Sequence, residues 1–179
     1  MVYQQSYPSP LGQICMYSDG TVLTGLWFDR STDARRHGRP EAAECADLPV
    51  FRETVKWLDI YFSGKDPGFT PEYRMEDLTP FRKEVVEIMC RIPYGQVITY
   101  NDIAQEITQA RQGRRTSPRA VGGAVGWNPI CIIVPCHRVV GAGGSLTGYG
   151  GGIQNKIRLL ELERQDLRRF TVPTKGTAL

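Results

Sequence analysis

The sequence has no apolar run that approaches the roughly 20 residues needed to cross a bilayer, which argues against a membrane-spanning protein. Its N-terminus lacks the charged segment and long apolar stretch of a secretory signal. Its five cysteines are odd in number and not closely paired, which argues against a disulfide framework. We therefore expect a reduced, cytoplasmic protein, and its 179 residues can form one domain or two small ones.

The net charge of +3 conceals an uneven distribution. Residues 1–90 contain 10 Lys and Arg against 14 Asp and Glu, a balance of −4, whereas residues 91–179 contain 12 against 5, a balance of +7. A basic C-terminal half suits a nucleic acid or another anionic partner, but an ordinary solvated surface can have the same composition. Charge alone leaves both interpretations open.

The sequence predicts an α/β (α+β) fold in two parts, residues 1–77 and 78–179. Apolar and polar residues with turn signals at the N-terminus indicate a small antiparallel sheet. The predicted strands are Val2–Tyr7, Gln13–Ser18 and Thr21–Phe28. A helix is predicted over Leu48–Phe62, while residues 31–47 form a variable loop or a short helix. Prolines and a glycine within Lys65–Asp77 interrupt regular structure, so the domain boundary is placed there.

The second part is predicted to be mainly helical. Caps and apolar spacing indicate four helices, over residues 80–91, 100–107 and 119–125 and from Ile153 to Arg164. The loop Thr108–Pro118 joins the middle two helices, and small residues in the second of them allow a partner helix or a DNA backbone to approach closely. This arrangement is typical of a helix-turn-helix, although a packed helix pair with solvated arginines gives the same pattern.

Residues 135–138, with the sequence Pro-Cys-His-Arg, place a thiol, an imidazole and a guanidinium side by side. They follow the apolar run Ile130–Val134, which predicts a buried strand, and they precede a glycine-rich stretch. The thiolate is the reactive form of cysteine, and a neighbouring base or cation raises its fraction. Cys136 is therefore a candidate nucleophile, although most cysteines are inert packing residues.

Three stretches of the second part resemble the O6-alkylguanine-DNA alkyltransferases, which are methylated-DNA-protein-cysteine S-methyltransferases. They are Thr99-Tyr100 through Arg119–Ala124, Asn128-Pro129 through Val140, and Gly148-Tyr149 through Lys156 to Glu163. About half of the chain carries these motifs, and the first part is similar in plan. The resemblance implies a direct-reversal DNA repair enzyme that acts once, as a monomer and without a cofactor, on double-stranded DNA containing O6-alkylguanine.

For the chemistry, the resemblance implies that Cys136 accepts the alkyl group and that His137 is its base. Adjacent side chains on a strand point to opposite faces, so His137 could not bond the thiol directly unless the backbone turns there. The resemblance implies a water that bridges the two. Glu163 would hold the other imidazole nitrogen, fix the tautomer and favour the charged state. Asn128 would tie the helix-turn-helix to the active-site strand, or simply form a turn. Arg138 is expected to be structural.

For the substrate, the resemblance implies base flipping, because the target guanine is stacked inside the duplex. Arg119 would enter the stack from the minor groove, and Tyr100 would assist extrusion and bond the purine. Tyr149 would form a wall of the guanine pocket, with backbone groups around Val139 and Gly150 contacting the base. Minor-groove and phosphate contacts suit a protein that must find lesions in any sequence. O4-methylthymine is a second expected substrate.

Two features depart from the family. Some relatives hold a structural zinc ion, but Cys15, His37 and Cys45 lack the short spacing of a zinc site, so we predict no metal. Cys131 stands where some relatives have a proline that lines the pocket, which would alter the tolerance for bulky adducts, but packing within a strand is the favoured explanation.

The loop Thr108–Pro118 is longer and more basic than in some relatives. Its arginines, Arg111, Arg114 and Arg115, are candidates for additional phosphate contacts.

Two other functions fit part of the pattern. A Cys-His-Glu set can also form an acyl-transfer triad, and a cysteine hydrolase of that kind would turn over repeatedly. A lesion sensor or a helix-turn-helix regulator would bind DNA without cysteine chemistry. Because non-catalytic relatives have lost the cysteine, the presence of Cys136 argues against such a binding module.

Overall fold

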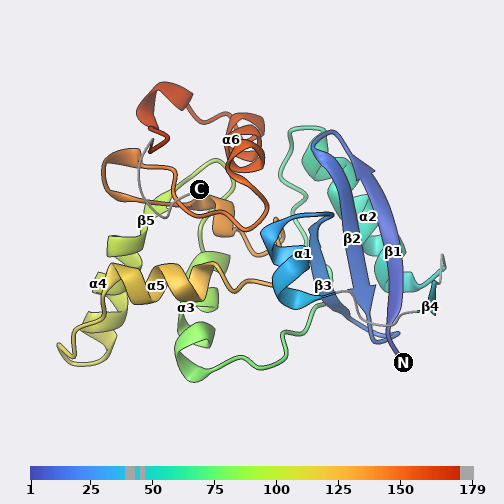
Figure 1. Ribbon diagram of the computed structural model, residues 1–179, viewed down its shortest axis with the longest axis horizontal. Helices are drawn as coiled ribbons and strands as arrows, with labels where there is room; N and C mark the ends of the chain where they lie inside the picture. Colours follow the sequence, from blue (N-terminus) through green and yellow to red (C-terminus); the bar gives the residue numbers. More distant parts are fainter. Residues whose placement is uncertain (39–42, 45–46, 174–179) are drawn as a thin grey trace. The chain divides into compact units, whose positions relative to one another are not determined.

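The computed structural model describes residues 1–38, 43–44 and 47–173, and the chain forms two compact units (Figure 1). The first unit comprises Met1–Asp77 and Pro129–Ile133, and the second comprises Leu78–Asn128 and Val134–Leu179. The return of Pro129–Ile133 to the first unit was not indicated by the sequence. Among the described residues, no helix has both the length and the apolar character required to cross a bilayer.

The sheet of the first unit contains the predicted antiparallel meander. Its strands are β1 (Tyr3–Ser9), β2 (Gly12–Ser18) and β3 (Leu23–Phe28). A two-residue strand, β4 (Ala43–Glu44), pairs in parallel with β1 and gives the order β3-β2-β1-β4. β2 lies inside the sheet, and its last five residues are all buried. The fourth strand was not predicted, because two residues carry no periodic signal.

Two helices complete the first unit. The short helix α1 (Thr32–His37) forms in the polar region where the sequence left a loop or a short helix open. The predicted amphipathic helix is α2 (Pro49–Phe62), which buries Phe51, Leu58 and Tyr61 completely. Its regular apolar spacing and the proline at its start explain why this helix was predictable.

The prediction of a strand over Ile130–Val134 is wrong. Ile130 forms an isolated bridge with Leu26, whose carbonyl accepts the N–H of Cys131 at 2.8 Å. The chain then turns, because Ile132 adopts the left-handed conformation with φ +71°. Cys131 is buried and its thiol donates to the Asp33 carboxylate at 3.2 Å, so this cysteine packs within the first unit.

The second unit is mainly helical, as predicted. Its main helices are α3 (Pro80–Cys90), α4 (Tyr100–Ala110), α5 (Pro118–Val125) and α6 (Ile153–Leu162). The side chains of Thr79, Thr99 and Ser117 accept a backbone N–H at the starts of α3, α4 and α5. α4 and α5 form the helix-turn-helix. Shorter elements are the parallel strands β5 (Ile98–Thr99) and β6 (Val139–Val140) and the 3-10 helices Cys136–Arg138, Ala142–Gly144 and Leu167–Arg169.

Two helix ends differ from the prediction. α4 continues to Ala110, so the connecting loop covers residues 111–117 and is shorter than expected. Thr108 accounts for this, because its hydroxyl donates to the Ala104 carbonyl and accepts the Thr116 N–H, which holds the loop against the last turn of the helix. Arg164 lies beyond the end of α6, with φ +62°, and is exposed rather than part of the apolar face.

Gly144 provides a test of the loop that precedes α6. A Cβ at Gly144 would lie 2.1 Å from the Arg169 carbonyl oxygen, and the residue has φ +78°. We expect Gly144→Ala to lower the free energy of unfolding by about 3 kcal/mol or more, because backbone must move to remove the clash. Gly143→Ala is the control, since Gly143 has φ +63° but nothing within 4 Å of the added atom, and it should cost about 1–2 kcal/mol. Equal losses in urea unfolding would contradict the close approach.

Candidate active site

Cys136 begins a 3-10 turn rather than ending a strand. Its backbone N–H donates to the Val134 carbonyl at 2.8 Å, and the 3-10 helix runs from Cys136 to Arg138. The Cys136 side chain is 6% exposed. Because the backbone turns here, the strand geometry that would direct Cys136 and His137 to opposite faces does not apply. Pro135, which lacks a backbone N–H, precedes this turn.

Asn128 contacts the candidate nucleophile directly. It follows α5, is 2% exposed, and its side-chain nitrogen donates to the Val134 carbonyl at 2.9 Å and to the Cys136 sulfur at 3.1 Å. The amide thus ties the end of the helix-turn-helix to the residues around the thiol. An N–H directed at sulfur also stabilises a negative charge there.

Glu163 joins the imidazole to the neighbouring guanidinium. His137 Nε2 lies 2.7 Å from Glu163 Oε1, and both side chains are completely buried. Arg138 donates from Nε to Glu163 Oε2 at 2.9 Å and from Nη2 to Oε1 at 3.0 Å, and its Nη1 donates to the Ile92 carbonyl at 2.7 Å. The Gly95 N–H also donates to Oε2, at 3.1 Å. A glutamate at the end of a helix would normally be exposed, but this one is surrounded by donors.

The charges of this group follow from its burial and contacts. Burial alone raises the pKa of Glu163, but attraction and hydrogen bonds from His137 and Arg138 outweigh it and lower the pKa to about 2. Burial lowers the pKa of His137, attraction and a hydrogen bond from Glu163 raise it, and the charges of Arg138 and Lys156 lower it further, so that the pKa lies below its usual value. His137 is therefore neutral near pH 7, with its proton on Nε2 facing the carboxylate and Nδ1 as the basic nitrogen. Glu163 still favours the charged imidazole, but burial and the positive charges of Arg138 and Lys156 outweigh its effect.

Lys156 is a buried cation that the sequence reasoning did not assign to the site. It lies on α6, and its Nζ donates to the Val139 carbonyl at 2.6 Å and to the Thr147 carbonyl at 3.2 Å. Burial lowers the pKa of Lys156 to about 8, while the negative charge of Cys136 opposes that shift. One signal was available: Lys156 shares the inward spacing of Ile153 and Leu160 on the last helix.

The other predicted site residues lie in several elements of the second unit. Tyr100 begins α4, and its hydroxyl donates to the Thr147 carbonyl at 3.3 Å, the same oxygen that accepts from Lys156. Tyr149 is buried, and Gly150 follows it in the loop before α6. Arg119 is exposed in the first turn of α5. The structure thus joins Cys136 with Asn128, and His137 with Glu163, by direct contacts, and Tyr100 with Lys156 through a shared acceptor.

The absence of a metal site stays a prediction. Cys45, which the sequence analysis considered together with Cys15 and His37, lies outside the described residues. Within the part of the chain that the structure describes, no group of three or more His, Cys, Asp or Glu side chains is placed to hold a metal ion.

The lowered pKa of the buried Glu163 carboxylate makes part of the free energy of unfolding depend on pH in the acid range. Because the Glu163 pKa falls from 4.5 to about 2 on folding, the stabilisation is complete above about pH 4.5 and is lost as the pH falls toward 2. Glu163→Gln leaves the Arg138 guanidinium buried without its counter-ion, so we expect a loss of about 3–5 kcal/mol at neutral pH and a weaker dependence on acid. Urea unfolding at several pH values measures both effects.

The matched control is Glu161→Gln on the same helix. Glu161 is exposed and pairs with the exposed Arg158 at 2.9 Å. Such pairs contribute about 0–1 kcal/mol, so this variant should unfold almost like the wild type. Similar losses for the two variants would contradict a special role of the buried carboxylate.

Two family models match most of the chain. The model described as 6-O-methylguanine DNA methyltransferase, ribonuclease-like domain, matches residues 2–72. The model described as 6-O-methylguanine DNA methyltransferase, DNA binding domain, matches residues 80–165.

Similar proteins agree with these matches. The chain is 41% identical over 166 residues to the methylated-DNA–protein-cysteine methyltransferase of Mycobacterium tuberculosis, covering 92% of this chain and 93% of that protein. It is 47% identical over 167 residues to the protein of the same name from Methanosarcina barkeri, covering 93% of this chain and 100% of that protein. The crystal structure of M. tuberculosis OGT in complex with DNA matches with a TM-score of 0.78 at 39% identity, covering 94% of each chain. The chain therefore belongs to the 6-O-methylguanine DNA methyltransferase family and repairs DNA by transferring an alkyl group from the DNA to a cysteine of the protein.

Proposed function

We propose that Cys136 is the acceptor and that it reacts once with the alkyl group of an O6-alkylguanine. The thiolate attacks the alkyl carbon, the S–C bond forms as the C–O bond breaks, and the electron pair leaves with guanine O6 while the purine takes up a proton. The contact of the Asn128 amide with the Cys136 sulfur carries this proposal, because it stabilises the thiolate inside the protein. The product is a thioether that water does not displace easily, so each molecule is consumed.

His137 acts as the base in this proposal. The neutral imidazole presents Nδ1 as acceptor, because Nε2 donates to Glu163. A water between the thiol and Nδ1 passes the proton from sulfur to nitrogen. The positive charge that then forms on His137 lies beside the Glu163 carboxylate, which is already ionised and does not need to reorganise.

The helix-turn-helix presents the residues for base flipping. Arg119 and Ala120 are exposed at the start of α5, and Gly123, one turn further on, is also exposed, with nothing within 4 Å of an added Cβ. Apart from Arg119, the side chains on this exposed face are small, which allows a minor groove to approach closely. Arg119 fills the gap that the extruded guanine leaves. The crystal structure of the similar M. tuberculosis OGT contains DNA, which supports DNA as the partner of this chain.

The guanine pocket is formed by groups around Tyr149. Burial raises the pKa of Tyr100, so its hydroxyl stays protonated and can donate to the purine when the base replaces the Thr147 carbonyl as acceptor. The Val139 carbonyl already accepts from Lys156, which orients it beside the base together with the backbone of Gly150. O4-methylthymine offers the same alkyl–oxygen bond in a smaller base, and we propose it as a second substrate.

Intact-mass analysis tests the acceptor. After mixing with duplex DNA that contains O6-methylguanine, the wild type should gain one methyl group and no more, whereas Cys136→Ser should gain none. Cys90→Ser is the matched control, because Cys90 is an exposed cysteine at the end of α3 and should not be needed. Release of methyl product in several turnovers would instead indicate a hydrolase, and an unmodified wild type would indicate a binding module.

Substitution of Arg119 separates base flipping from chemistry. We expect Arg119→Ala to slow methyl transfer from duplex DNA at least 10-fold, because the gap in the stack is not filled. Reaction with free O6-benzylguanine, which requires no flipping, should keep the wild-type rate. Equal slowing with both substrates would place Arg119 in the chemistry or in the fold and exclude a role in extrusion.

A further inference from the structure

We propose that a pocket between α4 and the loop 111–117 binds a backbone phosphate of the DNA, with Arg115 as its cation. This inference rests on the proposed function, since it extends the DNA contact beyond the flipped base. It assigns a phosphodiester site to a loop that contains three arginines, Arg111, Arg114 and Arg115.

The pocket has a volume of about 470 Å³ and a lining suited to an anion. Its lining residues carry amides, hydroxyls and one guanidinium, and none of them carries a carboxylate. They include Asn101, Gln105, Gln109, Arg115, Thr116 and Ser117. Neutral donors around one arginine are the usual contacts of a phosphate oxygen, and they recognise the backbone without reading sequence.

The three loop arginines are not equivalent. Arg111 donates from Nε and Nη2 to the Glu84 carboxylate at 3.1 and 2.7 Å, and its guanidinium lies 5.4 Å from the centre of the Phe81 ring. Arg111 therefore fastens the loop to α3 and its charge is already compensated. Arg114 and Arg115 are exposed, and within the described residues neither forms an ion pair. Of the three arginines that the sequence offered for phosphate contacts, only Arg114 and Arg115 remain candidates.

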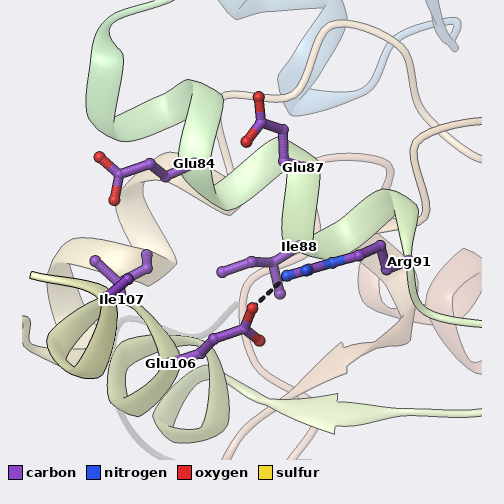
Figure 2. Close-up of a pocket in the computed structure, with 7 residues that line it drawn as sticks. Glu84, Glu87, Ile88, Arg91, Glu106 and Ile107 are labelled. Carbon is purple, nitrogen blue, oxygen red and sulfur yellow. Dashed lines mark hydrogen bonds and ion pairs between the residues drawn. The ribbon is translucent and has the colours of Figure 1, made fainter.

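The opposite side of α4 has the reverse electrostatic character. A second pocket, of about 400 Å³, lies between α3 and α4 and includes three carboxylates in its lining, those of Glu84, Glu87 and Glu106 (Figure 2). Glu106 pairs there with Arg91. A phosphate backbone would be repelled from Glu87, so the two pockets distinguish the DNA side of α4 from its other side.

The position of the basic pocket also fits the proposed finger. Arg115 precedes Arg119 by four residues, and Ser117 of the lining caps α5 at its start. Between Ile107 and Leu160 the sequence contains no Asp or Glu, so no carboxylate of this stretch opposes an approaching strand. When Arg119 occupies the base stack, Arg115 is close enough along the chain to reach a neighbouring phosphate of the same groove.

The salt dependence of binding to undamaged duplex DNA tests this site. Fluorescence anisotropy at about 50–200 mM KCl gives the slope of log Kd against log salt, and each lost phosphate contact reduces that slope by about 0.9. We expect Arg115→Ala to reduce the slope by about one contact and Arg114→Ala with Arg115→Ala by up to two. Gln105→Glu, which keeps both arginines but puts a carboxylate into the pocket, should weaken binding at low salt at least 5-fold.

Arg91→Ala is the matched control. It removes one exposed positive charge, as Arg115→Ala does, but from the acidic pocket, and it should leave the slope unchanged. An unchanged slope for Arg115→Ala, or an equal reduction for Arg91→Ala, would overturn the phosphate site. Methyl transfer at saturating DNA, followed by intact mass, keeps the two proposals apart: Arg115→Ala should still take up one methyl group, and a wild type that takes up none would overturn the proposed function instead.

Discussion

The active site of the second unit depends on one buried carboxylate. Glu163 accepts from the His137 ring, from two nitrogens of Arg138 and from the Gly95 N–H, and Arg138 in turn donates to the Ile92 carbonyl. These bonds connect the end of α6 with the 3-10 turn that carries Cys136 and with the chain that leaves α3. A buried carboxylate is tolerated because every oxygen has a donor and one donor is a permanent cation. The tautomer of the imidazole follows from the same contacts.

The buried charges of the site explain its protonation states together. Arg138 and Glu163 cancel, and Lys156 adds one positive charge whose pKa responds to Cys136. The positive charge of Lys156 favours a thiolate at Cys136. It also disfavours a second positive charge at His137 and so contributes to the lowered pKa of His137. In the proposed mechanism, moving the proton from sulfur to imidazole leaves the total charge unchanged, so this step requires little reorganisation of the surroundings.

Local signals in the sequence were sufficient for most elements of the fold. Thr79 and Thr99 correctly predicted the starts of α3 and α4, because a capping side chain binds the N–H groups of the next turn and needs no distant partner. The strand predicted over Ile130–Val134 is absent, since apolar composition indicates that a segment is buried but cannot show that Ile132 adopts the left-handed backbone conformation. For the site, the resemblance named residues that the structure joins, but the parts of Arg138 and Lys156 depend on burial and on contacts that only the folded chain creates.

The geometry of α4 connects the chemistry with the approach of the DNA. The helix begins at Tyr100, whose hydroxyl shares the Thr147 carbonyl with Lys156, and it ends where Arg111 binds Glu84. One face of the helix carries Glu106 toward the acidic pocket, and the other carries amides toward Arg115. Because a helix is rigid, a phosphate fixed on the amide face also fixes the position of Tyr100 relative to the duplex. In the proposed reaction, the backbone contact sets where the extruded base enters, and a single nucleophile that reacts once requires this orientation.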